Sequence, residues 1–156
     1  TGPSMSAFNA WVLLKSLETM TMRVERMSSN ALAIAEALEN HPKVASIKYP
    51  FLKSHKSYEV AKKQMSGGGS MVAITFNATA EQTFKFMNAL QVIDISNNLG
   101  DSKSLATHPA TTTHKRLGPE VRAKAGITDG TVRLSVGLEN VEDLLKDLRQ
   151  ALDKAF

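Results

Sequence analysis

The side chain in this sequence that is best placed to bind an anion is an arginine within a predicted strand. Apolar and polar residues alternate through residues 131–139, which is the pattern of a half-buried strand, and Arg133 falls on its polar face. A guanidinium held there suits a carboxylate, because its planar fork can donate two parallel hydrogen bonds. Taken alone, however, the strand pattern favours an ordinary arginine that faces solvent.

Two loop segments carry further groups that could hold the same anion. Asn98, Leu99 and Gly100 offer a side-chain amide and a backbone N–H. The row Thr111-Thr112-Thr113 offers hydroxyl groups. This row predicts either a wall of hydrogen-bond donors beside Arg133 or an edge strand whose threonine side chains face water.

Other kinds of site have weaker support. The triple glycine 67–69 lacks the Lys-Ser/Thr of a phosphate-binding P-loop and precedes a strand, so it indicates a turn. His108 and His114 have no third ligand fixed near them, which favours a structural role over metal binding. The serines lack a nucleophile elbow. We therefore expect no metal site and no serine-type catalytic site.

Composition narrows the class of protein. With 156 residues, 42% of them hydrophobic, the chain can form one domain with its own core. The absence of cysteine excludes disulfides and thiolate ligands and suits the cytoplasm. No apolar run approaches the ~18 residues of a membrane span. The formal charge is +4, but 19 basic residues are interleaved with 15 acidic ones, so we expect neither nucleic-acid nor membrane partners.

A long helix is predicted at the start of the chain, capped by Ser4 and ended by Pro42. Its apolar positions follow an unbroken four-three spacing: Leu13, Leu17, Met20, Val24, Met27, Ala31, Ile34 and Leu38. Such a helix would be roughly 50 Å long, whereas a compact domain of this size is roughly 40 Å across. The helix is therefore kinked, or part of it packs against protein outside this chain. We favour the second alternative. Pairing in a homodimer is the competing explanation.

The rest of the sequence alternates between short strands and helices. We expect strands at 44–49, 70–76, 92–95 and 131–139, and helices at 57–65, 79–90, 118–125 and 140–156. Thr79 begins a capping box and Asn140 caps the last helix. Gly126 follows the end of the helix predicted at 118–125. Together these elements predict an α/β fold with helices on one face of a small, mostly antiparallel sheet.

Several ordered motifs resemble the C-terminal part of the pyridoxal-phosphate (PLP) enzymes of cysteine and methionine metabolism. They run from about Gly2 to the C-terminus: Ser4-Met5-Ser6-Ala7-Phe8-Asn9-Ala10-Trp11, Leu17-Glu18-Thr19-Met20, Asn98-Leu99-Gly100-Asp101 with Ser104-Leu105, His108-Pro109-Ala110 with Thr113-His114, and Val132-Arg133-Leu134-Ser135-Val136-Gly137-Leu138-Glu139. Within this family, the segments 97–101 and 108–114 are most similar to the O-succinylhomoserine sulfhydrylases.

The resemblance implies the C-terminal small domain of a fold-type I, aminotransferase-like enzyme. Residues 1–40 would be a long connecting helix and residues 41–156 an α/β domain that closes the substrate site. In this family a large N-terminal domain binds PLP through a Schiff-base lysine. Its sulfhydrylases join sulfide to an acylated homoserine by γ-replacement and release succinate or acetate. The resemblance further implies a cytoplasmic homo-oligomer, a homotetramer, in methionine biosynthesis.

The family's site residues carry over in part. The arginine that holds the substrate α-carboxylate falls on Arg133, and Leu99 and Thr113 fall among the substrate-binding residues. The family serine before Leu-Gly falls on Asn98, so a proton relay is lost there although hydrogen bonding is kept. The Schiff-base lysine and the other cofactor-binding residues have no counterpart here and are expected upstream of Thr1. We therefore expect neither catalytic nor cofactor-binding residues in this chain, a part of a longer enzyme that is inactive alone.

Two alternatives stay open. Sister enzymes of the family, namely O-acetylhomoserine sulfhydrylase, cystathionine γ-synthase and methionine γ-lyase, would share these motifs. The long striped helix also suits a non-enzymatic oligomerisation module.

Overall fold

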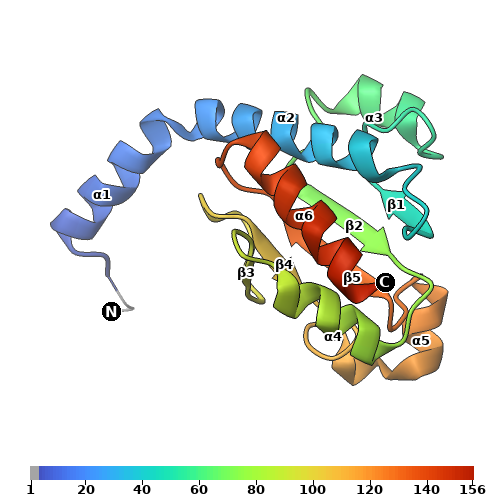
Figure 1. Cartoon of the computed structure of the whole chain (residues 1–156). Helices are drawn as coiled ribbons and strands as arrows, with labels where there is room; N and C mark the ends of the chain where they lie inside the picture. Colours follow the sequence, from blue (N-terminus) through green and yellow to red (C-terminus); the bar gives the residue numbers. More distant parts are fainter. Residues whose placement is uncertain (1–3) are drawn as a thin grey trace.

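The computed structural model describes residues 4–156, and it shows an α/β fold built on one five-stranded sheet (Figure 1). The strand order is β1-β2-β5-β4-β3. The strands are β1 (Ser46–Lys48), β2 (Met71–Thr75), β3 (Asp94–Ile95), β4 (Leu105–Thr107) and β5 (Thr131–Ser135). Only the β3–β4 pair is parallel, which confirms the prediction of a mostly antiparallel sheet.

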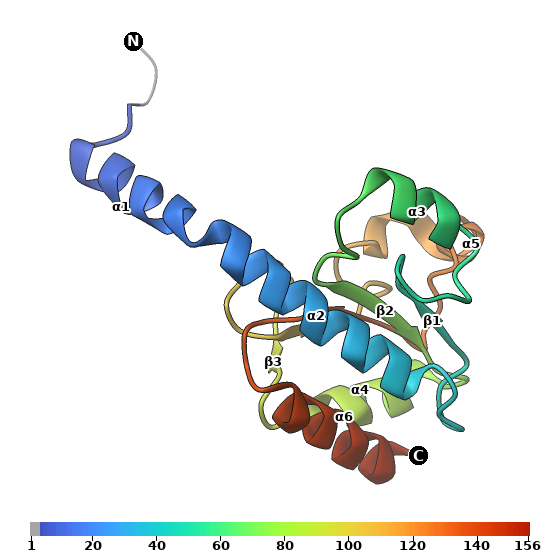
Figure 2. The same ribbon diagram turned by 90° about the horizontal axis from the view of Figure 1, so that it is seen from above.

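Six α-helices connect or cover these strands. They are α1 (Ala7–Glu18), α2 (Met20–Leu38), α3 (Tyr58–Gln64), α4 (Ala80–Ala89), α5 (Gly118–Lys124) and α6 (Val141–Ala155), with a short 3₁₀ turn at Lys115–Leu117. Figure 2 shows α4 and α6 on one side of the sheet and α5 on the other, so the prediction that the helices lie on one face is wrong for α5. Within residues 4–156, no helix has both the length and the apolarity needed to cross a bilayer.

The hydrophobic core lies between the sheet and the helices α2, α4 and α6. Alternate residues of the two longest strands point into it, and all are buried: Val72, Ile74, Val132 and Leu134. The helices contribute Ile34, Leu38, Phe86, Leu144 and Leu148. Burying such a side chain fully is worth about 1.5–3 kcal/mol, so this face fixes the register of β5. The intervening residues, Arg133 among them, therefore face the opposite side of the sheet.

The N-terminal helix differs from the prediction in two respects. It is interrupted at Thr19, which lies at φ −106° and ψ 8°, outside the helical region. The break removes the helical partner of the Ser16 carbonyl, which instead accepts a hydrogen bond from Arg23 Nη2. The prediction that Ser4 caps this helix is wrong, because Ser6 is the N-cap and its hydroxyl accepts from the Asn9 N–H.

The apolar stripe of this helix is buried over its second half only. Met27, Ala31, Ile34 and Leu38 lie in the core. Towards the N-terminus the helix leaves the sheet and projects away from the rest of the molecule (Figures 1 and 2). The large apolar side chains exposed along this projecting part are Phe8, Trp11, Val12, Leu13, Leu14, Leu17, Met20, Met22 and Val24.

Most of the remaining elements agree with the predictions. The capping box at Thr79 and the Asn140 cap are both formed. Gly126 lies just past α5 with φ +70°, as a glycine at a helix end should. Strand β4 was not predicted, however, because its three residues are all buried and show no alternation.

Candidate functional site

Arg133 lies in the middle of the sheet. On β5 it is paired with Ala73 of β2 on one side and with Thr107 of β4 on the other. Its side chain is half-buried on the face opposite the core. A central strand with neighbours on both sides is rigid, so the base of this guanidinium is fixed.

The guanidinium is oriented by three hydrogen bonds, all donated by Nη2. They go to the Asn97 carbonyl at 3.0 Å, the Asn98 carbonyl at 3.2 Å and the Thr107 hydroxyl at 3.2 Å. Nε is buried and makes no hydrogen bond within the described residues. A buried N–H without an acceptor costs about 1–3 kcal/mol, which an anionic ligand would recover. Arg133 is thus anchored at one nitrogen and unsatisfied at another, as a carboxylate-binding arginine requires.

The loop after β3 supplies two of these carbonyls. Its turn needs Gly100, which lies at φ +76° and donates its N–H to the Ser135 hydroxyl at 2.8 Å. The Asn98 N–H donates to the Ser96 hydroxyl at 3.2 Å. The side chains of Asn98 and Leu99 are exposed beside this turn. One backbone N–H of Asn98, Leu99 or Gly100 was predicted as a donor to the anion, and those of Asn98 and Gly100 donate within the loop instead.

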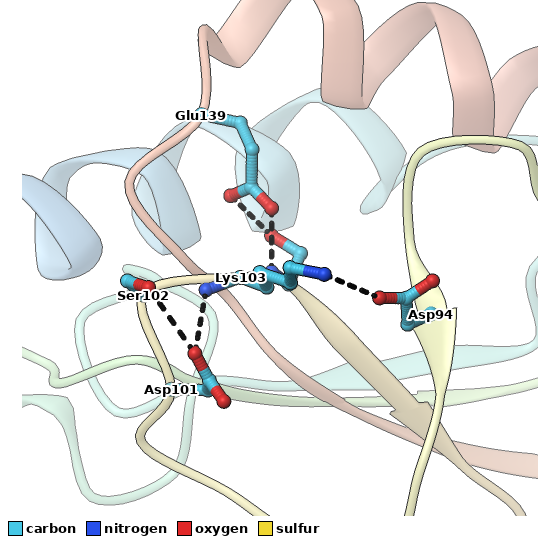
Figure 3. Close-up of polar contacts among 6 residues, drawn as sticks. Asp94, Asp101, Ser102, Lys103 and Glu139 are labelled. Atoms are coloured by element: carbon cyan, nitrogen blue, oxygen red, sulfur yellow. Dashed lines mark hydrogen bonds and ion pairs between the residues drawn. The ribbon is translucent and has the colours of Figure 1, made fainter.

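The far end of the same loop is fastened by Glu139 (Figure 3). The Glu139 carboxylate accepts from Ser104 twice, from its N–H at 2.6 Å and from its hydroxyl at 2.9 Å. The Ser104 hydroxyl also accepts from the Gly137 N–H at 2.8 Å. A Cβ on Gly137 would collide with the Ser102 carbonyl, so glycine is needed where the loop crosses the end of β5.

Asp101 and Lys103 stiffen the exposed tip of the loop (Figure 3). Asp101 Oδ1 accepts from the Lys103 N–H and from the Ser102 hydroxyl, each at 3.2 Å. These hydrogen bonds, the one from Lys103 first, lower the pKa of Asp101 below its ordinary value. Lys103 also forms a 3.5 Å ion pair with Asp94 of β3. The loop that holds Arg133 is therefore braced along its length.

The threonine row lies in a turn and not in an edge strand. The Thr111 hydroxyl is 2.8 Å from His108 Nδ1, and the Thr112 hydroxyl donates to the His108 carbonyl at 2.8 Å. The Thr113 hydroxyl is 2.9 Å from Nδ1 of His114. None of these hydroxyls bonds to Arg133, so the predicted wall of donors is not formed.

His108 has a structural role, as predicted, whereas the role of Thr107 was not predicted. His108 is buried, and its Nε2 lies 2.8 Å from the Asp129 carbonyl, which is a structural contact. The described residues contain no group of three potential metal ligands. Thr107, which does bond to Arg133, went unnoticed because it lies on the unpredicted strand β4.

A pocket of about 200 Å³ lies beside Arg133, between the sheet and the segment around α5. Its lining includes Lys48 of β1, Thr75 of β2, His114 and Gly126. We call it the basic pocket, because its charged side chains, Lys48 and Arg133, are both cationic and no carboxylate lines it. Its electrostatic character favours an anion.

The sequence was compared with known protein families and proteins. The family described as Cys/Met metabolism PLP-dependent enzyme matches residues 1–153. The chain is 53% identical over 156 residues to O-succinylhomoserine sulfhydrylase of Mycobacterium tuberculosis, covering 97% of this chain and 38% of that protein. It is 48% identical over 154 residues to O-acetyl-L-homoserine sulfhydrylase of Leptospira meyeri, covering 97% of this chain and 35% of that protein.

Solved structures agree with this result. The O-acetylhomoserine (thiol)-lyase of Campylobacter jejuni, which contains a pyridoxyl-lysine-phosphate, matches with a TM-score of 0.90 and 40% identity over 97% of this chain and 36% of that one. Cystathionine gamma synthase of Xanthomonas oryzae matches with a TM-score of 0.89 and 38% identity. The match covers 95% of this chain and 38% of that one. The chain thus spans less than two fifths of the length of these relatives.

The described residues do not by themselves fit PLP. A PLP enzyme needs a lysine within the cofactor site and protein groups that tune the ring. Every lysine in residues 4–156 is exposed except Lys43, which is half-buried and donates to the Phe156 carbonyl. Lys48 is the lysine that lines the basic pocket, and no carboxylate lies there to pair with a pyridinium nitrogen. The site instead offers two cationic side chains, Arg133 and Lys48, which suit an anion.

Proposed function

The chain belongs to the Cys/Met metabolism PLP-dependent enzymes, and we propose that it closes the substrate site of a sulfhydrylase that makes homocysteine from O-succinylhomoserine and sulfide. The observation that carries the proposal is Arg133, fixed on a central strand with an unsatisfied Nε beside a basic pocket. Relatives named for O-succinylhomoserine are 53% and 44% identical to the chain, and one named for O-acetyl-L-homoserine is 48% identical. The choice of the succinyl ester is supported by the first of these.

Arg133 binds the α-carboxylate of the acylated homoserine in this proposal. Nε donates a hydrogen bond to the carboxylate, while Nη2 keeps its hydrogen bonds to the loop carbonyls. Fixing the carboxylate fixes the direction of the side chain. In the overall replacement the Cγ–O bond is broken, succinate leaves, and sulfide supplies the sulfur of the new Cγ–S bond. Asn98 and Leu99 lie at the mouth of the site, where an exposed amide can reach a polar group of the substrate.

PLP and its lysine are held, we propose, by an N-terminal domain outside this chain, which covers only 38% of the Mycobacterium tuberculosis relative. The exposed apolar side chains of α1 support this, since an apolar surface of that size marks a contact with other protein. Residues 1–40 then connect the two domains, and the complete enzyme is a cytoplasmic homo-oligomer. A helix-mediated oligomerisation module would use the same surface without any enzyme.

A first prediction concerns the cofactor. The isolated chain of 156 residues, mixed with PLP, will show no stable imine absorption band and no cofactor attachment after borohydride reduction, because its lysines lie in water. Free lysine at the same concentration is the control for non-specific imine formation. A stoichiometric, reducible adduct at one lysine would contradict the proposal.

A second prediction concerns the substrate. The complete enzyme will release homocysteine from O-succinylhomoserine and sulfide with a higher kcat/KM than from O-acetylhomoserine. Cysteine in place of sulfide, and methionine alone, separate the enzyme from cystathionine γ-synthase and methionine γ-lyase. Preference for the acetyl ester, efficient cystathionine formation or methionine cleavage would assign the chain to a sister enzyme.

A further inference from the structure

Two cationic side chains lie on the same face of the sheet, on the two strands that flank β2. Lys48 of β1 and Arg133 of β5 are both paired with Ala73 of β2, from opposite sides. Neighbouring strands lie about 4.8 Å apart, so the two Cα atoms are roughly 10 Å apart, and paired residues point to the same face. The basic pocket includes both side chains.

The Lys48 ammonium is directed over Gly126 and has no carboxylate partner. A Cβ built on Gly126 would lie 2.5 Å from Lys48 Nζ, so the glycine provides the space that the ammonium occupies. The ion pairs found in residues 4–156 involve Lys15 and Lys103 and leave Lys48 out. His114 lines the same pocket, with its Nδ1 turned to the Thr113 hydroxyl. No acidic side chain neutralises this end of the pocket.

A ligand that fits this arrangement carries two carboxylates, one for each cation of the pocket. In an acylated homoserine with a succinyl group, about eight bonds separate the α-carboxylate from the terminal carboxylate, so the extended molecule spans roughly 10 Å between them. The acetyl ester lacks the second carboxylate. The similar relatives include enzymes named for each ester, so a second cation in the pocket would distinguish the two substrates.

We propose that Lys48 binds the terminal carboxylate of the succinyl group, with Arg133 holding the α-carboxylate. This inference rests on the proposed function and extends it to the leaving group. Lys48 is then a specificity residue: it contributes to binding of the succinyl ester and makes no contact with the acetyl ester. The ammonium donates a charge-assisted hydrogen bond to this carboxylate.

The test compares Lys48→Met, Lys48→Arg and the control Lys53→Met in the complete enzyme. Methionine keeps an unbranched apolar side chain and removes the charge, and Lys53 is an exposed lysine outside the basic pocket. We expect Lys48→Met to lower the ratio of kcat/KM for O-succinylhomoserine to that for O-acetylhomoserine about tenfold, mainly through KM, as for loss of one partly exposed ion pair. Lys48→Arg should keep most of the ratio, and Lys53→Met all of it.

An unchanged ratio in Lys48→Met, or equal losses with both esters, would overturn the role of Lys48. A wild-type enzyme that turns over neither ester refutes the proposed function instead, and succinate binding then tests the pocket by itself. Calorimetric titration of the complete protein with succinate should give a weaker affinity for Lys48→Met than for wild type and Lys53→Met. Equal affinities would show that Lys48 only packs against the end of α5.

Discussion

Replacing Arg133 by alanine in the complete enzyme will lower kcat/KM for the acylated homoserine about 100-fold. The substitution removes a charged donor that the loop carbonyls and Thr107 have already oriented, so the substrate carboxylate loses its partner. A hydrogen-bonded charge pair of this kind is worth ~2–4 kcal/mol, and ~1.4 kcal/mol corresponds to tenfold in rate. Steady-state kinetics over both substrates measures the effect.

Two further variants separate carboxylate binding from a general disturbance. Arg133→Lys should recover only part of the loss, because an ammonium cannot make the planar fork. Thr107→Val removes one of the three bonds to Nη2 and should cost much less than Arg133→Ala, since the two loop carbonyls remain. Kinetics unchanged in Arg133→Ala would refute its role in substrate binding.

Replacing Asp147 by alanine will destabilise the domain by about 3 kcal/mol. Its buried carboxylate on α6 accepts from three consecutive backbone N–H groups, those of Gln91 at 2.8 Å, Val92 at 2.9 Å and Ile93 at 3.0 Å, and from Gln150 Nε2 at 3.0 Å. Alanine would leave these donors without an acceptor, and the Ile93 N–H among them is buried. The segment they belong to leads into β3, so the loss also loosens the approach to the Arg133 loop.

The free energy of unfolding by urea measures this effect. Asp147→Asn keeps the shape but replaces one accepting oxygen by a donor, so we expect it to be destabilised as well, though less than alanine. Arg149→Ala, at an exposed position on the same helix, is the matched control and should change the free energy of unfolding by less than about 0.5 kcal/mol. An Asp147→Ala variant as stable as this control would contradict the account.

Local patterns in the sequence were sufficient to predict most elements of the fold. The alternation through residues 131–139 placed Arg133 on the polar face, and the caps at Thr79 and Asn140 are formed as expected. Such features depend on residues close together in the chain, so the sequence carries them directly. A kink in the long N-terminal helix was one of the two alternatives, but its position at Thr19 was not predicted, because the apolar stripe continues without interruption through that residue.

Contacts across the fold were harder to predict. Thr107 reaches Arg133 only because β4 pairs with β5, and a strand of three buried residues has no periodicity to reveal it. The threonine row looked like a set of free donors, yet two of its hydroxyls bond to His108 within a turn. The pairing of Lys48 with Arg133 through Ala73 likewise depends on sheet order, which short motifs do not specify.

The most direct measurement is a crystal structure of the complete enzyme with an unreactive analogue of O-succinylhomoserine bound. The α-carboxylate should lie about 2.7–3.0 Å from the Arg133 guanidinium, with Nε among its donors. A carboxylate bound elsewhere, with Arg133 still bonded only to the Asn97 and Asn98 carbonyls and Thr107, would contradict the assignment of this arginine as the substrate clamp.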